Sequence, residues 1–392
     1  MARSRGVALN ATLIVIAQST QAIAIGAIAL FLPLIRSDLG LTFTQAGLLA
    51  AVATLSYALM QVPAGVLADR VSPKTLFVVG VAGANALAIL FALANDFVLM
   101  LVIQAVAGIF RAAMFIPGML LMTRHFSEKR RATAMGLFVA GGFTSNIVIN
   151  LIGPLLVGPL GWQGVIVASS VVGLLFGAVL WFVGDDAPHH EADAPAPTRW
   201  VWRTPAWWLL GVIQFARLTA VSGFGLWLPA FLIDERGIPL ASAGLIVAVS
   251  AAITAPSNIG GGILSDRLGR PLLVIAVSLI ALTALFSLAG QIASIPVLLV
   301  VMGLIAVFIQ LYFGPLFAIP RQLFGPGLAG LSSGFGNFVA NLGGFSSAFV
   351  LGVLKDATGD FTAGFYYLAA VALVGAVAAL VLWRQPLPRP SG

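Results

Sequence analysis

Long apolar runs separated by short polar breaks repeat along the whole of this 392-residue chain. Each run holds about 20 residues or more, which is enough for a helix to cross roughly 30 Å of hydrocarbon. Backbone polar groups in lipid must form their hydrogen bonds within their own segment, so we expect the runs to be helices. The alternating segments of a membrane β-barrel, each about 10 residues long, are absent from the sequence. The pattern therefore predicts an all-α membrane protein.

Twelve transmembrane helices are predicted, arranged as two pseudo-symmetric six-helix bundles. The apolar runs cover residues 8–32, 44–66, 75–95, 98–122, 132–155, 164–183, 206–231, 241–263, 272–291, 295–318, 328–353 and 363–383. The long polar stretch 184–204 follows the sixth run and reads as a linker. We expect an N-terminal bundle over 1–183, a cytoplasmic linker over 184–204 and a C-terminal bundle over 205–392.

One short charged segment occurs twice, at corresponding places in the two halves. The stretch Gly65–Arg70 (GVLADR) returns 197 positions later as Gly262–Arg267 (GILSDR). At the same shift, Gly47 matches Gly244. Because separate landmarks keep the same phase, the chain is predicted to be an internal duplication of a six-span unit.

The composition is that of a membrane protein rather than of a water-soluble one. The chain is 60% hydrophobic and 8% charged, with a mean hydropathy of +1.06, whereas an average soluble domain has about 25% charged residues. The absence of cysteine excludes disulfides and thiol chemistry. No nucleophile–base pair and no metal-ligating cluster is visible in the sequence, so we expect no enzyme activity, no metal and no cofactor.

The net charge of +7 is explained by topology. If both termini are cytoplasmic, most of the 20 Lys and Arg residues fall in inner loops and ends, and only Arg36, Arg236 and Lys355 fall in outer loops. This asymmetry follows the positive-inside rule. The chain is therefore predicted to be a multi-pass protein of a bacterial inner membrane, with no nucleic-acid partner. We expect it to act as a monomer whose partners are the lipid bilayer and a small substrate.

The repeated segment resembles a loop motif of the major facilitator superfamily. The first copy, Gly65–Lys74, has the pattern GxLADRxxxK, and the second, Gly262–Arg270, fits the family pattern more closely. The first copy departs from it at Ser72-Pro73, where the family usually has Gly-Arg. Together with twelve spans, a central linker and a half-chain repeat, the resemblance covers essentially the whole chain.

This resemblance implies a transporter that exposes a central site alternately to each side of the membrane, lined by the first, fourth, seventh and tenth spans. Carriers built from repeats bind their cargo near the midplane, between the repeats. A motif glycine lets helices approach closely, and a motif aspartate suits a neighbouring helix N-terminus. We therefore expect these residues to form a conformational latch: Gly65, Asp69, Arg70, Gly262, Asp266 and Arg267.

Two cations lie inside the predicted spans. Arg111 in the fourth span and Arg217 in the seventh are each about 13 residues from either end, or roughly 18–20 Å from an interface, which is beyond the reach of an arginine side chain. The 13 acidic residues and three histidines can all be placed in loops or near span ends. Neither arginine thus has an acidic partner at its depth. Because arginine binds carboxylate or phosphate through paired hydrogen bonds, an anionic substrate is favoured.

Polar side chains on the expected lining spans extend this candidate site. Gln104 shares a helical face with Arg111, and Gln214 lies one turn before Arg217. The half-chain repeat aligns Gln18 with Gln214. The predicted substrate-binding residues are Arg111, Arg217, Gln18, Gln21, Gln104, Gln214, Gln310 and Tyr312, and none is predicted to be catalytic.

The sequence therefore predicts an alternating-access secondary transporter of a small anion, with a mono- or dicarboxylate favoured, working by exchange or facilitated transport. Proton symport is disfavoured because it would need an embedded carboxylate or histidine. The alternatives are efflux of hydrophobic drugs or metabolites, and a sensor or scaffold without transport activity. For the two arginines the alternative is a structural role, with each guanidinium satisfied by backbone carbonyls, glutamine and water.

Overall fold

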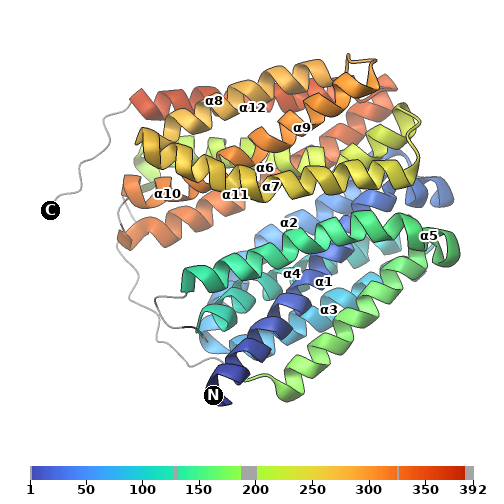
Figure 1. The fold of residues 1–392 in the computed structure, drawn as a ribbon, viewed down its shortest axis with the longest axis vertical. Helices are drawn as coiled ribbons and strands as arrows, with labels where there is room; N and C mark the ends of the chain where they lie inside the picture. The colour runs from blue at the N-terminus through green and yellow to red at the C-terminus, as the bar shows by residue number, and fades with distance from the viewer. Residues whose placement is uncertain (1, 125, 127–130, 187–200, 325, 385–392) are drawn as a thin grey trace. The chain divides into compact units, whose positions relative to one another are not determined.

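The computed structural model describes residues 2–124, 126, 131–186, 201–324 and 326–384. These ranges are helical apart from short turns, and no strand occurs in them (Figure 1), which confirms the predicted all-α class. Within them, 11 helical stretches are long and apolar enough to cross a membrane. One of these, α5, supplies two of the twelve predicted spans.

The first half of the chain folds into five helices. They are α1 (Ala2–Leu39), α2 (Phe43–Arg70), α3 (Pro73–Leu93), α4 (Phe97–Arg124) and α5 (Arg131–Val183). Helix α5 turns back on itself at Gly161, whose backbone is non-helical with φ 67° and ψ 170° (Figure 1). Glycine adopts this left-handed φ without a steric penalty. The fifth and sixth predicted spans are therefore two helical segments that meet at Gly161.

The second half begins with a short 3-10 turn and holds seven α-helices. They are η2 (Val201–Arg203), α6 (Pro205–Ala230) with its π-helical extension η3 (Phe231–Glu235), α7 (Leu240–Leu268), α8 (Pro271–Ala289), α9 (Ile295–Leu311), α10 (Phe313–Phe324), α11 (Pro326–Thr358) and α12 (Thr362–Arg384). The tenth predicted span, 295–318, is thus interrupted at residue 312. The hydropathy pattern did not predict this break.

Two compact units make up the described chain. Unit 1 comprises Met1–Leu41, Leu48–Asp193 and Leu232–Ala248, and unit 2 comprises Thr42–Gly47, Ala194–Phe231 and Val249–Gly392. The first turns of α2 therefore belong to unit 2, and those of α7 belong to unit 1. The domain boundaries expected from the sequence, at 183 and 205, stay a prediction.

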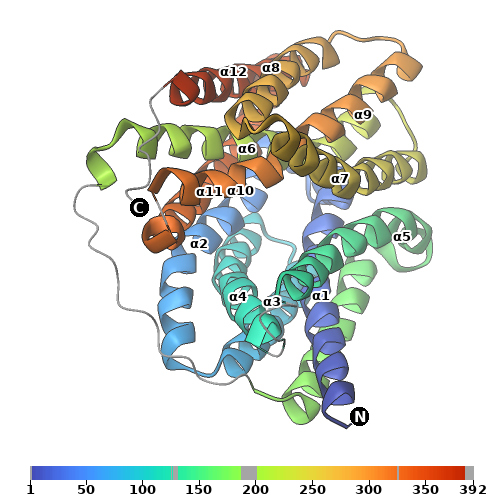
Figure 2. The same ribbon diagram turned by 60° about the vertical axis from the view of Figure 1, so that its left-hand side comes forward.

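Equivalent helices pack in the same way inside each unit. In unit 1, α1 packs along α5, and α3 packs against α4 and α5. In unit 2, α6 packs along α11, while α8 packs against α12 and both parts of the broken span (Figure 2). The half-chain shift relates α1 to α6 and the first arm of α5 to α11, so the repeat in sequence is also a repeat in packing.

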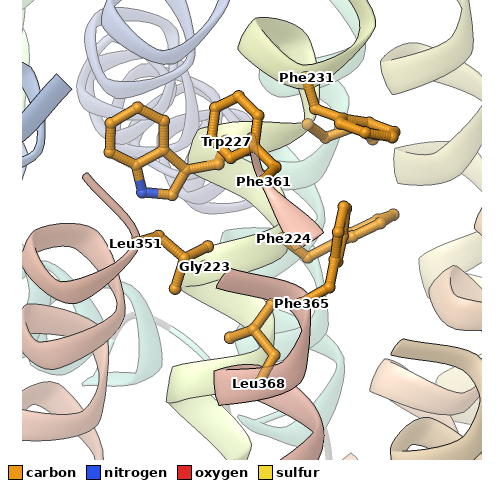
Figure 3. A pocket seen from close by; sticks show the side chains of 9 residues that line it. Gly223, Phe224, Trp227, Phe231, Leu351, Phe361, Phe365 and Leu368 are labelled. Carbon is orange, nitrogen blue, oxygen red and sulfur yellow. The ribbon is translucent and has the colours of Figure 1, made fainter. Parts of the chain in front are cut away.

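Aromatic side chains fill the core of each unit. In unit 1, Phe31, Phe91 and Trp162 are buried in one cluster, and the Trp162 indole donates a 2.7 Å hydrogen bond to the Asp38 carboxylate. In unit 2, rings from α6 and α12 surround a pocket (Figure 3). That pocket has a volume of about 10 Å³, which is about the space of one water molecule. It is a packing gap in an apolar core and is too small for a drug-sized ligand.

The first turn of α2 is capped within unit 2. The Asp356 carboxylate accepts hydrogen bonds from the backbone N–H groups of Phe43 (3.0 Å) and Thr44 (2.7 Å). A carboxylate at a helix N-terminus satisfies exposed N–H groups and complements the positive end of the helix dipole. The ammonium of Lys355 lies over the rings of Phe43 (5.3 Å) and Phe361 (4.8 Å). This end of α2 is thereby fixed to α11 and to the turn between α11 and α12.

Two glycines related by the repeat allow close helix contacts near the first turns of α2 and α7. A Cβ atom on Gly47 of α2 would overlap the backbone carbonyl of Ala348 in α11, within unit 2. A Cβ atom on Gly244 of α7 would overlap the carbonyl of Asn150 in α5, within unit 1. In the same part of unit 1, Arg36 pairs with Asp234 at 3.2 Å. The repeated glycines therefore serve the same purpose in each unit.

Alanine at either glycine should destabilise the protein, because the added methyl meets a backbone carbonyl and forces two helices apart. Overpacking of this kind costs about 1–3 kcal/mol. We expect Gly47→Ala and Gly244→Ala each to lower the Tm of the detergent-purified protein. Gly225→Ala is the matched control, since nothing lies within 4 Å of its added Cβ. Equal Tm values for all three variants would contradict the close contacts.

Candidate binding site at buried arginines

Arg217 lies in the middle of α6 and is buried, with 5% of its surface exposed. Its Nε donates a 2.9 Å hydrogen bond to Oε1 of Gln214, one turn earlier in the same helix. Its Cζ lies 5.3 Å from the centre of the Phe313 ring. A guanidinium over an aromatic ring is attracted by about 0.5–2 kcal/mol, more when both groups are desolvated. The cation is thus oriented by an amide along its Nε edge and by a ring against its face.

The ring reaches Arg217 from a break in the tenth span. Tyr312, with φ −94° and ψ 0°, separates α9 from α10. Pro315 has no N–H to donate to the Leu311 carbonyl one turn earlier, and its ring would clash with that carbonyl in a regular helix. The Leu311 carbonyl instead lies against Gly261 of α7, where any Cβ would overlap it. The break therefore has a cause in Pro315 and a complement in Gly261.

Two further predicted residues flank this break. Tyr312 is fully buried and interacts electrostatically with Arg217, and its hydroxyl has no hydrogen-bond partner among the described residues. Gln310 is also buried, and its Oε1 likewise has no partner there. The structure thus brings together Gln214, Arg217 and Tyr312 of the predicted residues within unit 2. Gln310 lies two residues before Tyr312, near the end of α9, at a junction predicted from the sequence to be continuous helix.

Phe313 was missing from the predicted set, although it makes the aromatic contact with Arg217. The sequence holds a usable signal for it. A Gly314-Pro315 pair inside an apolar run predicts a helix break, and the residues at such a break are released from regular helical spacing. The hydropathy of the run does not report this signal.

The predicted residues of unit 1 are more dispersed. Arg111 in α4 is 7% exposed, and its side chain forms no hydrogen bond or ion pair within the described ranges. Gln104 of the same helix is 2% exposed. On α1, Gln18 Nε2 donates a 3.3 Å hydrogen bond to Gln21 Oε1, while Gln18 Oε1 is buried without a partner. Unit 1 therefore repeats the polar pair of unit 2, with Gln21 standing where unit 2 has Arg217.

The second copy of the loop motif lines a cavity that also reaches Gly314 and Pro315 at the start of α10. Gly262, Asp266 and Arg270 line a space of about 530 Å³ together with Gln322 and Trp383. Asp266 and Arg267 are exposed, and no described residue forms an ion pair with either. The predicted latch role of this copy stays a prediction.

The first copy ends differently, at the position where its sequence departs from the family. Ser72 caps α3 by accepting a 3.1 Å hydrogen bond from the Thr75 N–H, and Pro73 is the first helical residue. In the second copy the chain turns at Gly269, with φ 60°. Ser-Pro is thus a helix-starting cap that replaces a glycine turn. Arg70 is exposed and Gly65 is half-buried, whereas the side chain of Asp69 lies outside the described residues.

A match to a known family accounts for this architecture. Residues 14–348 match the sequence model of the Major Facilitator Superfamily. The chain belongs to the Major Facilitator Superfamily. It is therefore a multi-pass membrane transporter and not an enzyme, as the repeated loop motif predicted.

Similar proteins within the superfamily span nearly the whole chain. A hexuronate transporter of Bacillus subtilis is 24% identical over 389 residues, covering 93% of this chain and 92% of that protein. A nitrite extrusion protein of Bacillus subtilis is 25% identical over 361 residues, covering 89% and 87%. In fold, the chain is similar to a bacterial homologue of the human lysosomal transporter Spinster, with a TM-score of 0.81 at 17% identity over 96% of each chain.

Replacing Arg111 by a residue of similar size distinguishes a binding residue from a structural one. A buried cation without a partner destabilises the folded state, so we expect Arg111→Met to raise the Tm of the purified, ligand-free transporter by about 2 °C or more. Arg203→Met, at an exposed position, should leave the Tm unchanged. A lower Tm for Arg111→Met would mean that the guanidinium stabilises the fold.

Proposed function

We propose that this protein is a secondary transporter of a small anion, a mono- or dicarboxylate, in the inner membrane of a bacterium. The observation that carries the proposal is the pair of buried arginines, one in each unit, inside helices long enough to span the membrane. Burying a guanidinium in such a helix costs several kcal/mol unless a partner offsets the charge. A bound anion supplies that partner. The names of the hexuronate and nitrite proteins support a small anion as the cargo.

The surroundings of Arg217 suit a carboxylate. Gln214 and Phe313 hold the guanidinium in one orientation, which lowers the entropic cost of forming paired hydrogen bonds with a planar anion. Gln18, Gln21, Gln104, Gln310 and Tyr312 are the further residues that we propose to act on the cargo. The roles of Gly65, Asp69, Arg70, Gly262, Asp266 and Arg267 as a latch, and the cytoplasmic placement of both termini, belong to the same proposal.

Exchange or facilitated transport fits this site better than proton symport. The acidic residues fall near the ends of the predicted spans, so a proton-carrying carboxylate is not expected at the depth of the arginines. A site that bears positive charge resists passage through a closed, dehydrated state, and a bound anion lowers that resistance. Efflux of hydrophobic drugs gains no support from the aromatic pocket of Figure 3, because its volume is about 10 Å³.

Counterflow in liposomes tests the proposal directly. Vesicles containing the purified protein and a carboxylate at high concentration should accumulate the same labelled carboxylate from outside. We expect Arg111→Gln and Arg217→Gln each to reduce this flux by about 100-fold or more, as is common when a charged partner of a buried ion is removed.

Arg203→Gln serves as the control, because Arg203 is exposed and lies outside the long apolar helices. Its flux should match that of the unmodified protein. Full anion transport in both Arg111→Gln and Arg217→Gln would refute the proposed role of the arginines.

A further inference from the structure

The candidate site in unit 2 has unused hydrogen-bond acceptors as well as a cation. Gln310 Oε1 is buried without a partner in the described chain, close in sequence to the ring that covers Arg217. The Tyr312 hydroxyl, which can donate and accept, is also buried and unpaired there. An unsatisfied buried acceptor costs about 1–3 kcal/mol. Such groups are uncommon in folded proteins, and a binding site is one place where a ligand satisfies them.

An amide oxygen is satisfied only by a hydrogen-bond donor. Nitrate, nitrite and unsubstituted carboxylates carry acceptors alone near neutral pH, so they can pair with a guanidinium or a phenol but leave Gln310 Oε1 unsatisfied. A hydroxyl group on the carbon chain of a carboxylate does donate. The acceptor beside the break therefore discriminates between two classes of anion that arginine alone would bind equally.

Both kinds of contact come from the same break in the tenth span. Gln310 is the second-last residue of α9, and Phe313, whose ring covers the Arg217 guanidinium, is the first residue of α10. The unpaired acceptor therefore lies three residues along the chain from the contact with the cation, within unit 2.

Unit 1 also has a buried acceptor without a partner among the described residues, at a position that the repeat relates to Gln214. There Gln18 uses its Nε2 to bond Gln21, which leaves Gln18 Oε1 buried without a partner. The repeat aligns Gln18 with Gln214, whose Oε1 is instead satisfied by Arg217. Unit 1 thus has the neutral Gln21 where unit 2 has Arg217, and the acceptor left without a partner is that of Gln18.

We propose that the cargo is a hydroxycarboxylate, whose carboxylate binds Arg217 and whose hydroxyl donates to Oε1 of Gln310. This inference rests on the proposed anion transport and narrows its substrate class. It places the chain with the hexuronate transporter rather than with the nitrite extrusion protein in the kind of anion carried, although the two are almost equally similar to it in sequence.

A series of matched ligands tests the inference on the unmodified protein. Tartrate, malate and succinate are four-carbon dicarboxylates with two, one and no hydroxyl groups, and gluconate and hexanoate form a six-carbon monocarboxylate pair. Nitrate represents the bare oxyanions. We expect the thermal stabilisation of the detergent-purified transporter to require at least ~10-fold less of the hydroxylated member in one of the two carboxylate sets. Such a factor is in keeping with one hydrogen bond to an otherwise unpaired acceptor.

Gln310→Met tests the named acceptor, because methionine keeps the length of the side chain and removes the amide. It should abolish the preference for hydroxylated ligands while the hydroxyl-free carboxylate still stabilises the protein. Gln291→Met, at an exposed glutamine, should keep the preference. A hydroxyl preference that survives in Gln310→Met would overturn the assignment to this residue.

The outcomes separate this inference from the proposed function. Equal or better stabilisation by succinate and hexanoate, or by nitrate, would overturn the hydroxycarboxylate assignment and leave anion transport standing, provided that Arg217→Gln abolishes the stabilisation. If no anion stabilises the protein and Arg217→Gln changes nothing, the proposed function fails together with the inference. The comparison on the unmodified protein does not depend on the folding of any variant.

Discussion

A guanidinium buried within an apolar helix is the constraint on which this site depends. Lipid offers neither water nor counter-ions, so every charge there must be oriented and offset by nearby groups. Around Arg217 the chain meets this demand with an amide one turn away and an aromatic ring from another helix. The ring belongs to Phe313, the first residue after the break in the tenth span. The helix break, the glycine that faces it and the orientation of the cation therefore form one connected arrangement.

The duplication supplies the scaffold, and the differences between its copies supply the chemistry. Equivalent helices pack alike in each unit, and Gly47 and Gly244 make the same kind of close contact. The copies diverge at Gln21, which stands where unit 2 has Arg217. They diverge again at the repeated loop, where a serine cap replaces a glycine turn. Features shared by both copies belong to the fold, whereas the difference between Gln21 and Arg217 falls in the region proposed to bind the cargo.

Most of the fold could be predicted from sequence because hydropathy reports directly on the length of chain that must lie in lipid. The fifth and sixth spans were predicted as separate segments, and Gly161 lies at their junction. The broken tenth span could not be read in this way, because it depends on a single residue, Pro315, that acts on backbone geometry and leaves hydropathy unchanged. The site was predictable in part for the same reason. Arg217 and Gln214 share a helix, so their spacing placed them together, whereas Phe313 comes from another helix.

The junction at Tyr312 also has a mechanical consequence. An intact helix resists bending because each carbonyl is tied to an N–H group one turn further along. At Leu311 that tie is missing, since Pro315 has no hydrogen to offer, and the carbonyl rests against the bare Cα of Gly261. Flexing at this point breaks no hydrogen bond between Leu311 and Pro315. The point where α9 and α10 lack this hydrogen bond thus lies next to Phe313, whose ring covers Arg217. The segment can therefore bend close to the buried cation.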